Sequence, residues 1–369
     1  MPDARRFVEL QGPLRTYRGG ELPSVTIAYE TWGELRGRGD NALLLFTGLS
    51  PSAHAASSAA DPSPGWWEYM IGPGKPIDTE RFFVIAINSL GSCFGSTGPA
   101  SINPETGQAY RLDFPKLSVE DIAAAARGAC LALGIDHVHT VAGCSLGGMD
   151  VLAYGMMYPG TYRDLISISA AANATPFAIA LRSIQREAIR ADPAWAGGNY
   201  APGNGPKDGM RIARQLGILT YRSPEEWLQR FDRERIEGAD AQRDPFATAF
   251  QVQSYMDANA RKFAERFDAN CYLYLSQTMD LFDVADHGGG NPEAGMRQVD
   301  ARRALVAGVT TDWLYPLWQQ HQLAELLAHA GASVSYHELE SIQGHDAFLI
   351  DKDRFGPMVA EFLAGMPRG

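Results

Sequence analysis

Residues 143–147, Gly-Cys-Ser-Leu-Gly, have the residue types and spacing of a nucleophilic serine site. In the Gly-x-Ser-x-Gly pattern, a serine on a sharp turn between a strand and a helix presents its hydroxyl, and the glycines let neighbouring backbone pass closely. The run Val138–Ala142 predicts the strand, and the run Gly148–Tyr154 predicts the helix. The N-terminus of that helix favours negative charge, as an oxyanion requires. We therefore predict that Ser145 is a nucleophile.

A serine hydroxyl needs a general base, and the base needs an orienting carboxylate. In α/β-hydrolase-like folds the chain order is Ser, then Asp or Glu, then His. Of the eight histidines, His345 is the one in a polar loop that follows the last expected strand, so we predict that it is the base. Asp312 directly follows another expected strand and is the predicted orienting acid, with Asp280 and Asp283 as alternatives.

A Gly/Pro-containing loop follows the second expected strand and begins Thr-Gly-Leu-Ser-Pro at residues 47–51. In this architecture an amide of that loop and the amide after the nucleophile form the oxyanion hole. We predict that Leu49 and Leu146 supply these two N–H groups.

The elements that must position these residues alternate between strand-like and helix-like segments, which predicts an α/β fold with a mainly parallel sheet. Most of the strand-like segments are continuous apolar runs, as strands covered on both faces should be. They are Ser24–Tyr29, Ala42–Thr47, Phe82–Asn88, His137–Ala142, Leu165–Ala170, Ala304–Val309 and Ser333–Leu339.

Strand signals nearly vanish between residues 176 and 298, where helical periodicity alternates with two loop-like stretches, 197–209 and 286–295. We predict a core domain of residues 1–175 and 299–369, and a helical lid insertion over 176–298. Such an insertion would cover the carboxyl ends of the strands, where open α/β sheets place their sites.

Composition excludes several classes of function. With 369 residues, 45% of them hydrophobic and a net charge of −11, the chain suits a globular enzyme and not a nucleic-acid binder. No apolar run is long enough to span a membrane, so no membrane partner is expected. The four cysteines form no metal-ligand pattern, and we expect no metal and a reducing, cytoplasmic location.

Eight motifs in order give the chain a specific resemblance. They are Gly-Trp-Trp-Glu at 65–68, Gly-Pro-Gly-Lys at 72–75, Asn-Ser-Leu-Gly-Ser-Cys at 88–93, Gly-Ser-Thr-Gly-Pro at 95–99, Ser-Leu-Gly-Gly-Met at 145–149, Gln-Arg-Glu-Ala-Ile at 185–189, Arg-Phe-Asp-Ala-Asn at 266–270 and Gly-His-Asp-Ala-Phe at 344–348. From about residue 29 to residue 363, the chain resembles the homoserine O-acyltransferase family of the α/β-hydrolase superfamily.

The resemblance implies acyl transfer from acyl-CoA, a substrate rather than a cofactor, to the hydroxyl of an amino acid. It implies that Ser145 carries the acyl group, with His345 as the base and Asp312 as its orienter. It also implies that Arg214 binds the acceptor and that Asp346 holds the acceptor's ammonium. Family members have a helical lid and are usually homodimers.

One region departs from the homoserine pattern. Members that act on homoserine typically have Thr-Gly-Asp at the first oxyanion loop, whereas this chain has Thr-Gly-Leu-Ser-Pro at 47–51. The chain is similar there to the subgroup that acts on L-serine, the serine O-succinyltransferases and serine O-acetyltransferases. The candidate specificity residues of this loop are Gly48, Pro51, Ser52, Ala53, His54 and Ala55. A pocket that distinguishes one methylene contributes only about 1–3 kcal/mol, so we expect a preference rather than absolute selectivity.

Arg182 stands where homoserine enzymes usually have Asn, and Arg186 lies one helical turn further on. A guanidinium binds a second carboxylate in a bidentate manner, so Arg182 and Arg186 are candidate partners for a succinyl group. The resemblance to the serine subgroup implies succinyl-CoA as the donor, with acetyl-CoA as the alternative. Alternatively, Arg182 and Arg186 face the phosphates of CoA, solvent or acidic residues of the lid. Two rival functions remain: an esterase or thioesterase, which would need no ammonium site, and a catalytically silent binding protein.

Overall fold

The computed structural model describes residues 3–238 and 244–365. Its centre is an eight-stranded sheet in the spatial order β1-β4-β8-β5-β9-β10-β11-β12. The two pairs that involve β4 are antiparallel and all the other pairs are parallel. The strands are β1 (Arg6–Glu9), β4 (Thr26–Trp32), β5 (Ala42–Phe46), β8 (Phe83–Ile87), β9 (Val138–Cys144), β10 (Tyr162–Ile168), β11 (Arg303–Val309) and β12 (Ser333–Leu339). Two small ribbons lie outside this sheet, β2 (Leu14–Arg15) with β3 (Glu21–Leu22) and β6 (Ile71–Gly72) with β7 (Ile77–Asp78).

The sheet is buried on both faces, and alternate side chains of one strand enter different cores. In β5, Leu44 and Phe46 belong to one hydrophobic cluster, and Leu43 and Leu45 belong to the other. This alternation is the two-residue period of a strand, and it explains why the strand sequences are apolar throughout. The helices on the first side are α1 (Val119–Ala132), α2 (Leu146–Met157) and α9 (Leu317–His329). Those on the second side are α10 (Ala347–Ile350) and α11 (Lys352–Ala364).

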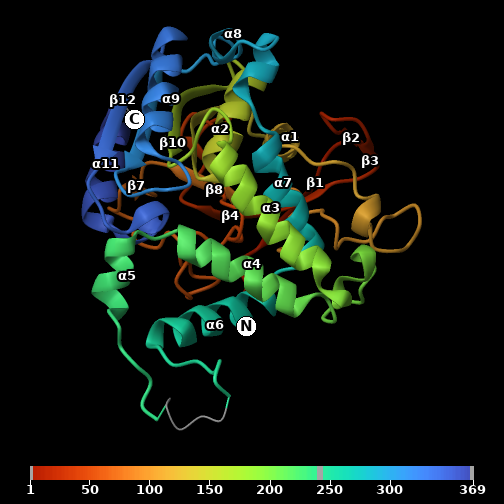
Figure 1. Ribbon diagram of the computed structural model, residues 1–369. Coiled ribbons are helices and arrows are strands. Elements are labelled where there is room, and N and C mark those ends of the chain that lie inside the picture. Colours follow the sequence, from red (N-terminus) through yellow and green to blue (C-terminus); the bar gives the residue numbers. More distant parts are fainter. Residues whose placement is uncertain (1–2, 239–243, 366–369) are drawn as a thin grey trace.

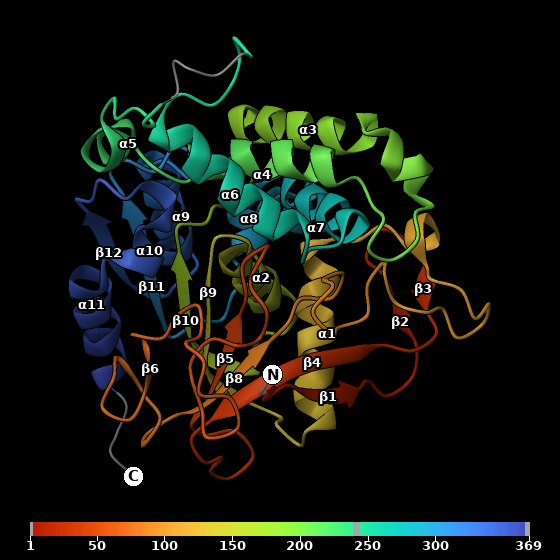
Figure 2. The ribbon, with the colours of Figure 1, turned by 90° about the horizontal axis from the view of Figure 1, so that it is seen from below.

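The described part of the segment between β10 and β11 holds helices and contributes no strand to the central sheet. Its helices are α3 (Pro176–Ala191), α4 (Lys207–Thr220), α5 (Pro224–Phe231), α6 (Gln251–Ala264), α7 (Ala269–Leu281) and α8 (Pro292–Met296). α4 packs between α3 and α6, and α3 also contacts α7. α3, α4, α6 and α7 form a layer on one side of the central strands, whereas α8 lies near α9 (Figures 1 and 2).

The strands expected from the sequence are all present, with ends displaced by up to three residues. Two loop predictions were partly wrong. The stretch 286–295 contains the start of α8, because Asn291 caps that short helix through the amides of Glu293 and Ala294. The stretch 197–209 overlaps the first turn of α4, which begins at Lys207.

No helix among the described residues is long and apolar enough to cross a membrane.

Candidate active site

Ser145 lies on the tight turn between β9 and α2. Its backbone has φ 57° and ψ −123°, a conformation that a residue with a Cβ rarely adopts. The flanking glycines allow this turn because there is no room for side chains. A Cβ on Gly143 would lie 2.2 Å from the carbonyl oxygen of Gly147, and a Cβ on Gly147 would lie 2.6 Å from the carbonyl oxygen of Phe46. The Gly-x-Ser-x-Gly pattern therefore has a direct steric cause.

His345 connects the serine to a buried carboxylate. Its Nε2 lies 2.9 Å from Oγ of Ser145, and its Nδ1 lies 2.7 Å from Oδ2 of Asp312. His345 and Asp312 are both 4% exposed. The three residues predicted from chain order are thus brought into one hydrogen-bonded line, although 200 positions separate the serine from the histidine.

Asp312 lies three residues after the end of β11 and is oriented by the backbone after it. Its Oδ1 accepts hydrogen bonds from the amides of Leu314 at 2.9 Å and Tyr315 at 3.0 Å, which leaves Oδ2 for the histidine. The two rival carboxylates have other partners. Asp280 binds arginines of α3, and Asp283 caps the turn that follows α7.

The surroundings of His345 determine its protonation. Burial lowers the pKa of His345, but the negative charge and the hydrogen bond of Asp312 outweigh burial, so the net shift is upward. The imidazole packs against the rings of Tyr315, Tyr221 and Phe348, at centroid distances of 5.2, 5.7 and 5.6 Å. These rings hold the imidazole in place. A buried base paired with a carboxylate in this way can take a proton from a serine hydroxyl.

The predicted oxyanion hole consists of two amides beside the serine. The amides of Leu49 and Leu146 donate no hydrogen bond to another described residue. Gly48 reaches the turn of the nucleophile, because a Cβ on Gly48 would lie 4.0 Å from the carbonyl oxygen of Cys144. Both amides are therefore available for the predicted role.

The loop predicted to set specificity is only partly accessible. Ala53 and Ala55 are fully buried. His54 already uses both ring nitrogens, with Nδ1 2.9 Å from Glu30 and Nε2 2.9 Å from the carbonyl oxygen of Ser63. Of the candidate specificity residues, Gly48, Pro51, Ser52 and His54 are half-buried.

Side chains from two of the sequence motifs donate hydrogen bonds to the backbone of this loop. Nε1 of Trp66 donates to the carbonyl oxygen of Ser52 at 3.1 Å, and Nδ2 of Asn88 donates to that of Pro51 at 3.4 Å. The Gly-Trp-Trp-Glu and Asn-Ser-Leu-Gly motifs thus fix the backbone next to the nucleophile.

Of the predicted acceptor-binding pair, Asp346 is next to His345 in the chain, and Arg214 contacts a ring that packs on His345. The guanidinium of Arg214 lies 4.6 Å from the ring centre of Phe263 and 5.7 Å from that of Tyr221, which itself packs on His345. Arg214 forms no ion pair within the described part of the chain, and its Nε is buried without a hydrogen-bond partner. Asp346 follows His345 in the chain, and its side chain is 21% exposed.

Arg182 and Arg186 share one carboxylate from another lid helix. Nε of Arg182 lies 2.5 Å from Oδ1 of Asp280, and Nη2 of Arg186 lies 2.6 Å from Oδ2. Two cations thus meet one anion, and Nη2 of Arg182 is buried without a partner. The charge of Arg182 also lowers the pKa of His345, which places it within electrostatic reach of the base.

Three residues near the base were not found from the sequence. Tyr221 and Arg222 connect α4 to α5, and Tyr315 precedes α9. Tyr315 lies only three residues after Asp312, and its amide binds that carboxylate, so closeness in the chain was a local signal for Tyr315. For Tyr221 and Arg222 no local signal exists, because only the packing of the lid on the core brings them to His345.

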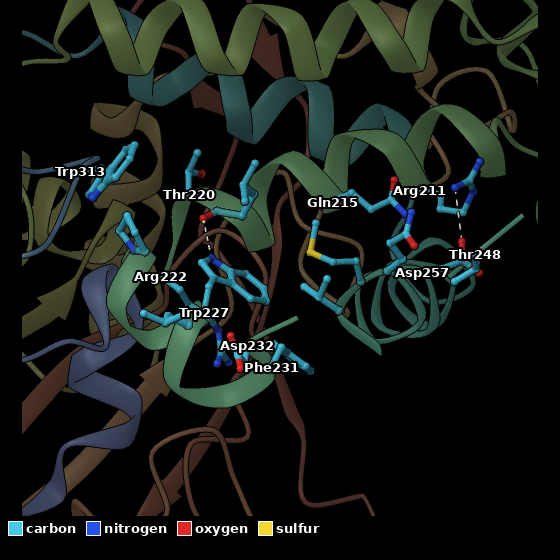
Figure 3. Close-up of a pocket in the computed structure, with 16 residues that line it drawn as sticks. Arg211, Gln215, Thr220, Arg222, Trp227, Phe231, Asp232, Thr248, Asp257 and Trp313 are labelled. Carbon is cyan, nitrogen blue, oxygen red and sulfur yellow. Dashed lines mark hydrogen bonds and ion pairs between the residues drawn. The ribbon is translucent and has the colours of Figure 1, made fainter. Parts of the chain in front are cut away.

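A cavity of about 890 Å³ lies between α4, α5 and α6, and Figure 3 shows its lining residues. Trp313, next to Asp312, and Arg222 belong to its wall, whereas the three triad residues do not. Within the described ranges, no group of three or more His, Cys, Asp or Glu residues is arranged to hold a metal ion.

A mainly parallel α/β sheet with a Ser–His–Asp line at the carboxyl end of its strands defines an enzyme class that uses a serine nucleophile. Comparison with known proteins narrows this class. A family model described as alpha/beta hydrolase fold matches residues 41–351. A protein of Litchfieldella anticariensis named serine O-succinyltransferase is 86% identical over 364 residues, covering 99% of each chain.

Solved structures with the same fold include an acyltransferase and an esterase. The crystal structure of homoserine O-acetyltransferase from Bacillus anthracis has a TM-score of 0.89 at 29% identity and covers 98% of both chains. That of esterase E22 has a TM-score of 0.87 at 28% identity, with 97% of this chain and 99% of the other covered. The chain belongs to the alpha/beta hydrolase fold family. Within it, the chain belongs to the same family as the relative named serine O-succinyltransferase. The family resemblance and the fold predicted from the sequence are confirmed.

Proposed function

We propose that this chain transfers the succinyl group of succinyl-CoA to the hydroxyl of L-serine and forms O-succinyl-L-serine, a precursor for cysteine biosynthesis. The observation that carries the proposal is the Ser145–His345–Asp312 line in a chain 86% identical to a protein named serine O-succinyltransferase. The unpaired guanidinium of Arg214 and the carboxylate of Asp346 beside the base support an amino-acid acceptor rather than water.

The proposed reaction has two half-reactions. His345 Nε2 takes the proton of Ser145 as Oγ attacks the thioester carbon. The carbon–sulfur bond breaks, CoA leaves with the proton from His345, and the succinyl group stays on Oγ as an ester. The amides of Leu49 and Leu146 stabilise the oxyanion of each tetrahedral intermediate.

In the second half-reaction L-serine enters with its carboxylate at Arg214 and its ammonium at Asp346. His345 takes the proton of the serine hydroxyl, whose oxygen attacks the succinyl ester. The bond to Ser145 breaks, and Oγ regains the proton from His345. The enzyme thus returns to its initial state after a ping-pong cycle.

The donor preference is proposed from Arg182 and Arg186. One carboxylate, Asp280, faces both guanidinium groups, so a positive charge is left over for the distal carboxylate of a succinyl group. Acetyl-CoA lacks that carboxylate and remains the alternative donor.

One assay tests the proposal: release of free CoA thiol from succinyl-CoA or acetyl-CoA, with no amino acid, with L-serine or with L-homoserine. We expect the fastest release with succinyl-CoA and L-serine. Release unchanged by any amino acid would favour an esterase or thioesterase, as in the esterase E22 neighbour. No release from either donor would favour a silent binding protein.

We further propose a homodimer in the cytoplasm. The four cysteines are all free thiols, which suits a reducing compartment. Ile212, Leu219 and Leu228 of the lid helices are exposed apolar residues that a second copy would cover. Light scattering should then give twice the chain mass of 40.1 kDa.

A further inference from the structure

The junction between α4 and α5 holds the loop that carries His345. The carbonyl oxygen of Tyr221 accepts a hydrogen bond from the amide of Asp346 at 3.1 Å. Oγ of Ser223 donates to the carbonyl oxygen of Ile342 at 2.5 Å. Both ends of the histidine turn are therefore bonded to the lid.

Arg222, between these two residues, lies against two carboxylates. Its Nη1 is 2.5 Å from Oε1 of Glu226, and its Nε is 3.6 Å from Oδ2 of Asp346. The guanidinium also lies 5.9 Å from the ring centres of Trp227 and Tyr255, within the range of a cation–π contact. Figure 3 shows Arg222 and Trp227 on the same cavity wall. The side chain of Arg222 is 11% exposed, so its orientation is fixed by these neighbours.

Arg222 contacts the two carboxylates in different ways. Glu226 forms a hydrogen-bonded ion pair with Arg222, whereas 3.6 Å is too long for a hydrogen bond to Asp346. Asp346 thus receives electrostatic support while its oxygens remain free to accept N–H donors. Its side chain is 21% exposed and that of Glu226 is 7% exposed, so a ligand reaches Asp346 more readily.

We propose that Arg222 is a positioning residue for the acceptor step: it holds Asp346, ionised and oriented, to receive the ammonium of the amino-acid acceptor. This inference rests on the proposed function, because only an amine acceptor gives Asp346 that task.

The charges around Asp346 agree with this assignment. Burial raises the pKa of Asp346 and is the largest effect, so the net shift is upward, although His345, Arg222 and Arg214 each oppose it. Without Arg222 the pKa of Asp346 would rise further, and the carboxyl would lose its charge at a higher pH. A protonated carboxyl binds an ammonium poorly.

The test compares Arg222→Gln with Arg230→Gln in the full-length protein. Arg230 is a matched control, because its Nη1 lies 3.5 Å from the same Glu226 oxygen and it forms no ion pair with Asp346 within the described residues. Two rates are measured: the burst of CoA release from succinyl-CoA alone, and kcat/KM for L-serine.

For Arg222→Gln we expect kcat/KM for L-serine to fall by about tenfold or more, as expected for a weakened contact to a charged group. The burst should fall far less, because acylation does not use Asp346. Arg222→Lys should restore most of the loss, and Arg230→Gln should resemble the parent. The acidic limb of the pH profile of kcat/KM for L-serine should lie at higher pH in Arg222→Gln.

A double variant gives the sharpest comparison. If Arg222 acts through Asp346, adding Arg222→Gln to Asp346→Asn causes no further loss of kcat/KM for L-serine. Independent, multiplying losses would overturn the inference, as would a burst that falls in parallel with the serine step. A parent enzyme that releases CoA but acylates no amino acid would overturn the proposed function together with the inference. A parent that acylates L-serine, with Arg222→Gln equally active, would overturn the inference alone.

Discussion

At the residue scale, Ser145 combines a strained backbone with a complete set of hydrogen-bond partners. The positive φ of 57° places Oγ where His345 reaches it at 2.9 Å, and Asp312 in turn reaches His345 at 2.7 Å. Each residue of the line fixes the next one. The chemistry therefore depends on the three residues as a unit, and replacing Ser145 or His345 alone should cost nearly as much as removing the whole set.

Replacing the nucleophile tests whether the acyl group passes through Ser145. Ser145→Ala should lower the rate of acyl transfer by on the order of 10⁶, as in other serine triads. Incubation with succinyl-CoA followed by intact-protein mass spectrometry should show a succinyl adduct on the parent and none on the variant. An adduct of equal yield on Ser145→Ala would contradict the assignment.

Asp312→Asn keeps the shape of the acid and removes its charge. The rate should fall by about 10⁴, because the imidazole is no longer held in the correct tautomer. The negative charge of Asp312 raises the pKa of His345, and only the neutral imidazole accepts a proton. The acidic limb of the pH profile for acylation should therefore move to lower pH in this variant. An unchanged limb would mean that another group sets it.

At the element scale, the turn of His345 is a packing contact between lid and core. Gly344 has φ 63°, and a Cβ there would lie 2.7 Å from the carbonyl oxygen of Tyr221 and 2.9 Å from Cα of Arg222. The absence of a side chain lets the junction of α4 and α5 approach the base. The lid therefore positions His345 as well as covering it.

A comparison of Gly344→Ala with Gly160→Ala should separate the effect of the steric contact from the effect of the positive φ. Both glycines have positive φ, but a Cβ at Gly160 would meet nothing within 4 Å. Gly344→Ala should lower the free energy of unfolding by about 1–3 kcal/mol and Gly160→Ala by less. Displacement of His345 should also cost Gly344→Ala about 10²-fold in kcat. Denaturant titrations and steady-state rates check both numbers, and equal effects in the two variants would contradict the packing argument.

At the scale of the whole molecule, the layers enclose a buried carboxyl group that the chemistry does not use. Asp150 in α2 is fully buried, and both of its carboxyl oxygens lack a hydrogen-bond partner. Burial raises the pKa of Asp150 well above its ordinary value. A carboxyl in such surroundings keeps its proton in the folded state.

The stability of the fold should therefore depend on pH through Asp150. Between the ordinary pKa of an aspartate, about 4, and its raised value in the folded state, the folded protein binds more protons than the unfolded chain. The free energy of unfolding of the parent should thus fall as pH rises, through this group, by at most about 1.4 kcal/mol per pH unit. Asp150→Asn removes this loss, so it should gain stability relative to the parent between pH 5 and 8. Urea unfolding at several pH values measures the difference, and a difference independent of pH would contradict the prediction.

The sequence by itself determined the parts of this protein that leave a local signal. The strand–turn–helix around Ser145, the apolar strands, and Asp312 and His345 in the loops after two of these strands were predictable because each depends on its near neighbours in the chain. Sheet topology then places strand ends at one edge, so the order of the three residues sufficed to predict their meeting. The family motifs gave Arg214 and Asp346 as candidates, without their surroundings.

Only the tertiary structure decided which groups surround that line. Tyr221 and Arg222 contact the His345 loop from a lid segment more than a hundred residues earlier, and Asp280 meets Arg182 from another helix. Such contacts depend on how amphipathic helices pack on one another, and neither spacing nor propensity in a single segment specifies that packing. The chemistry of the nucleophile was thus encoded locally, whereas the environment of the acceptor site arose when the lid packed against the core.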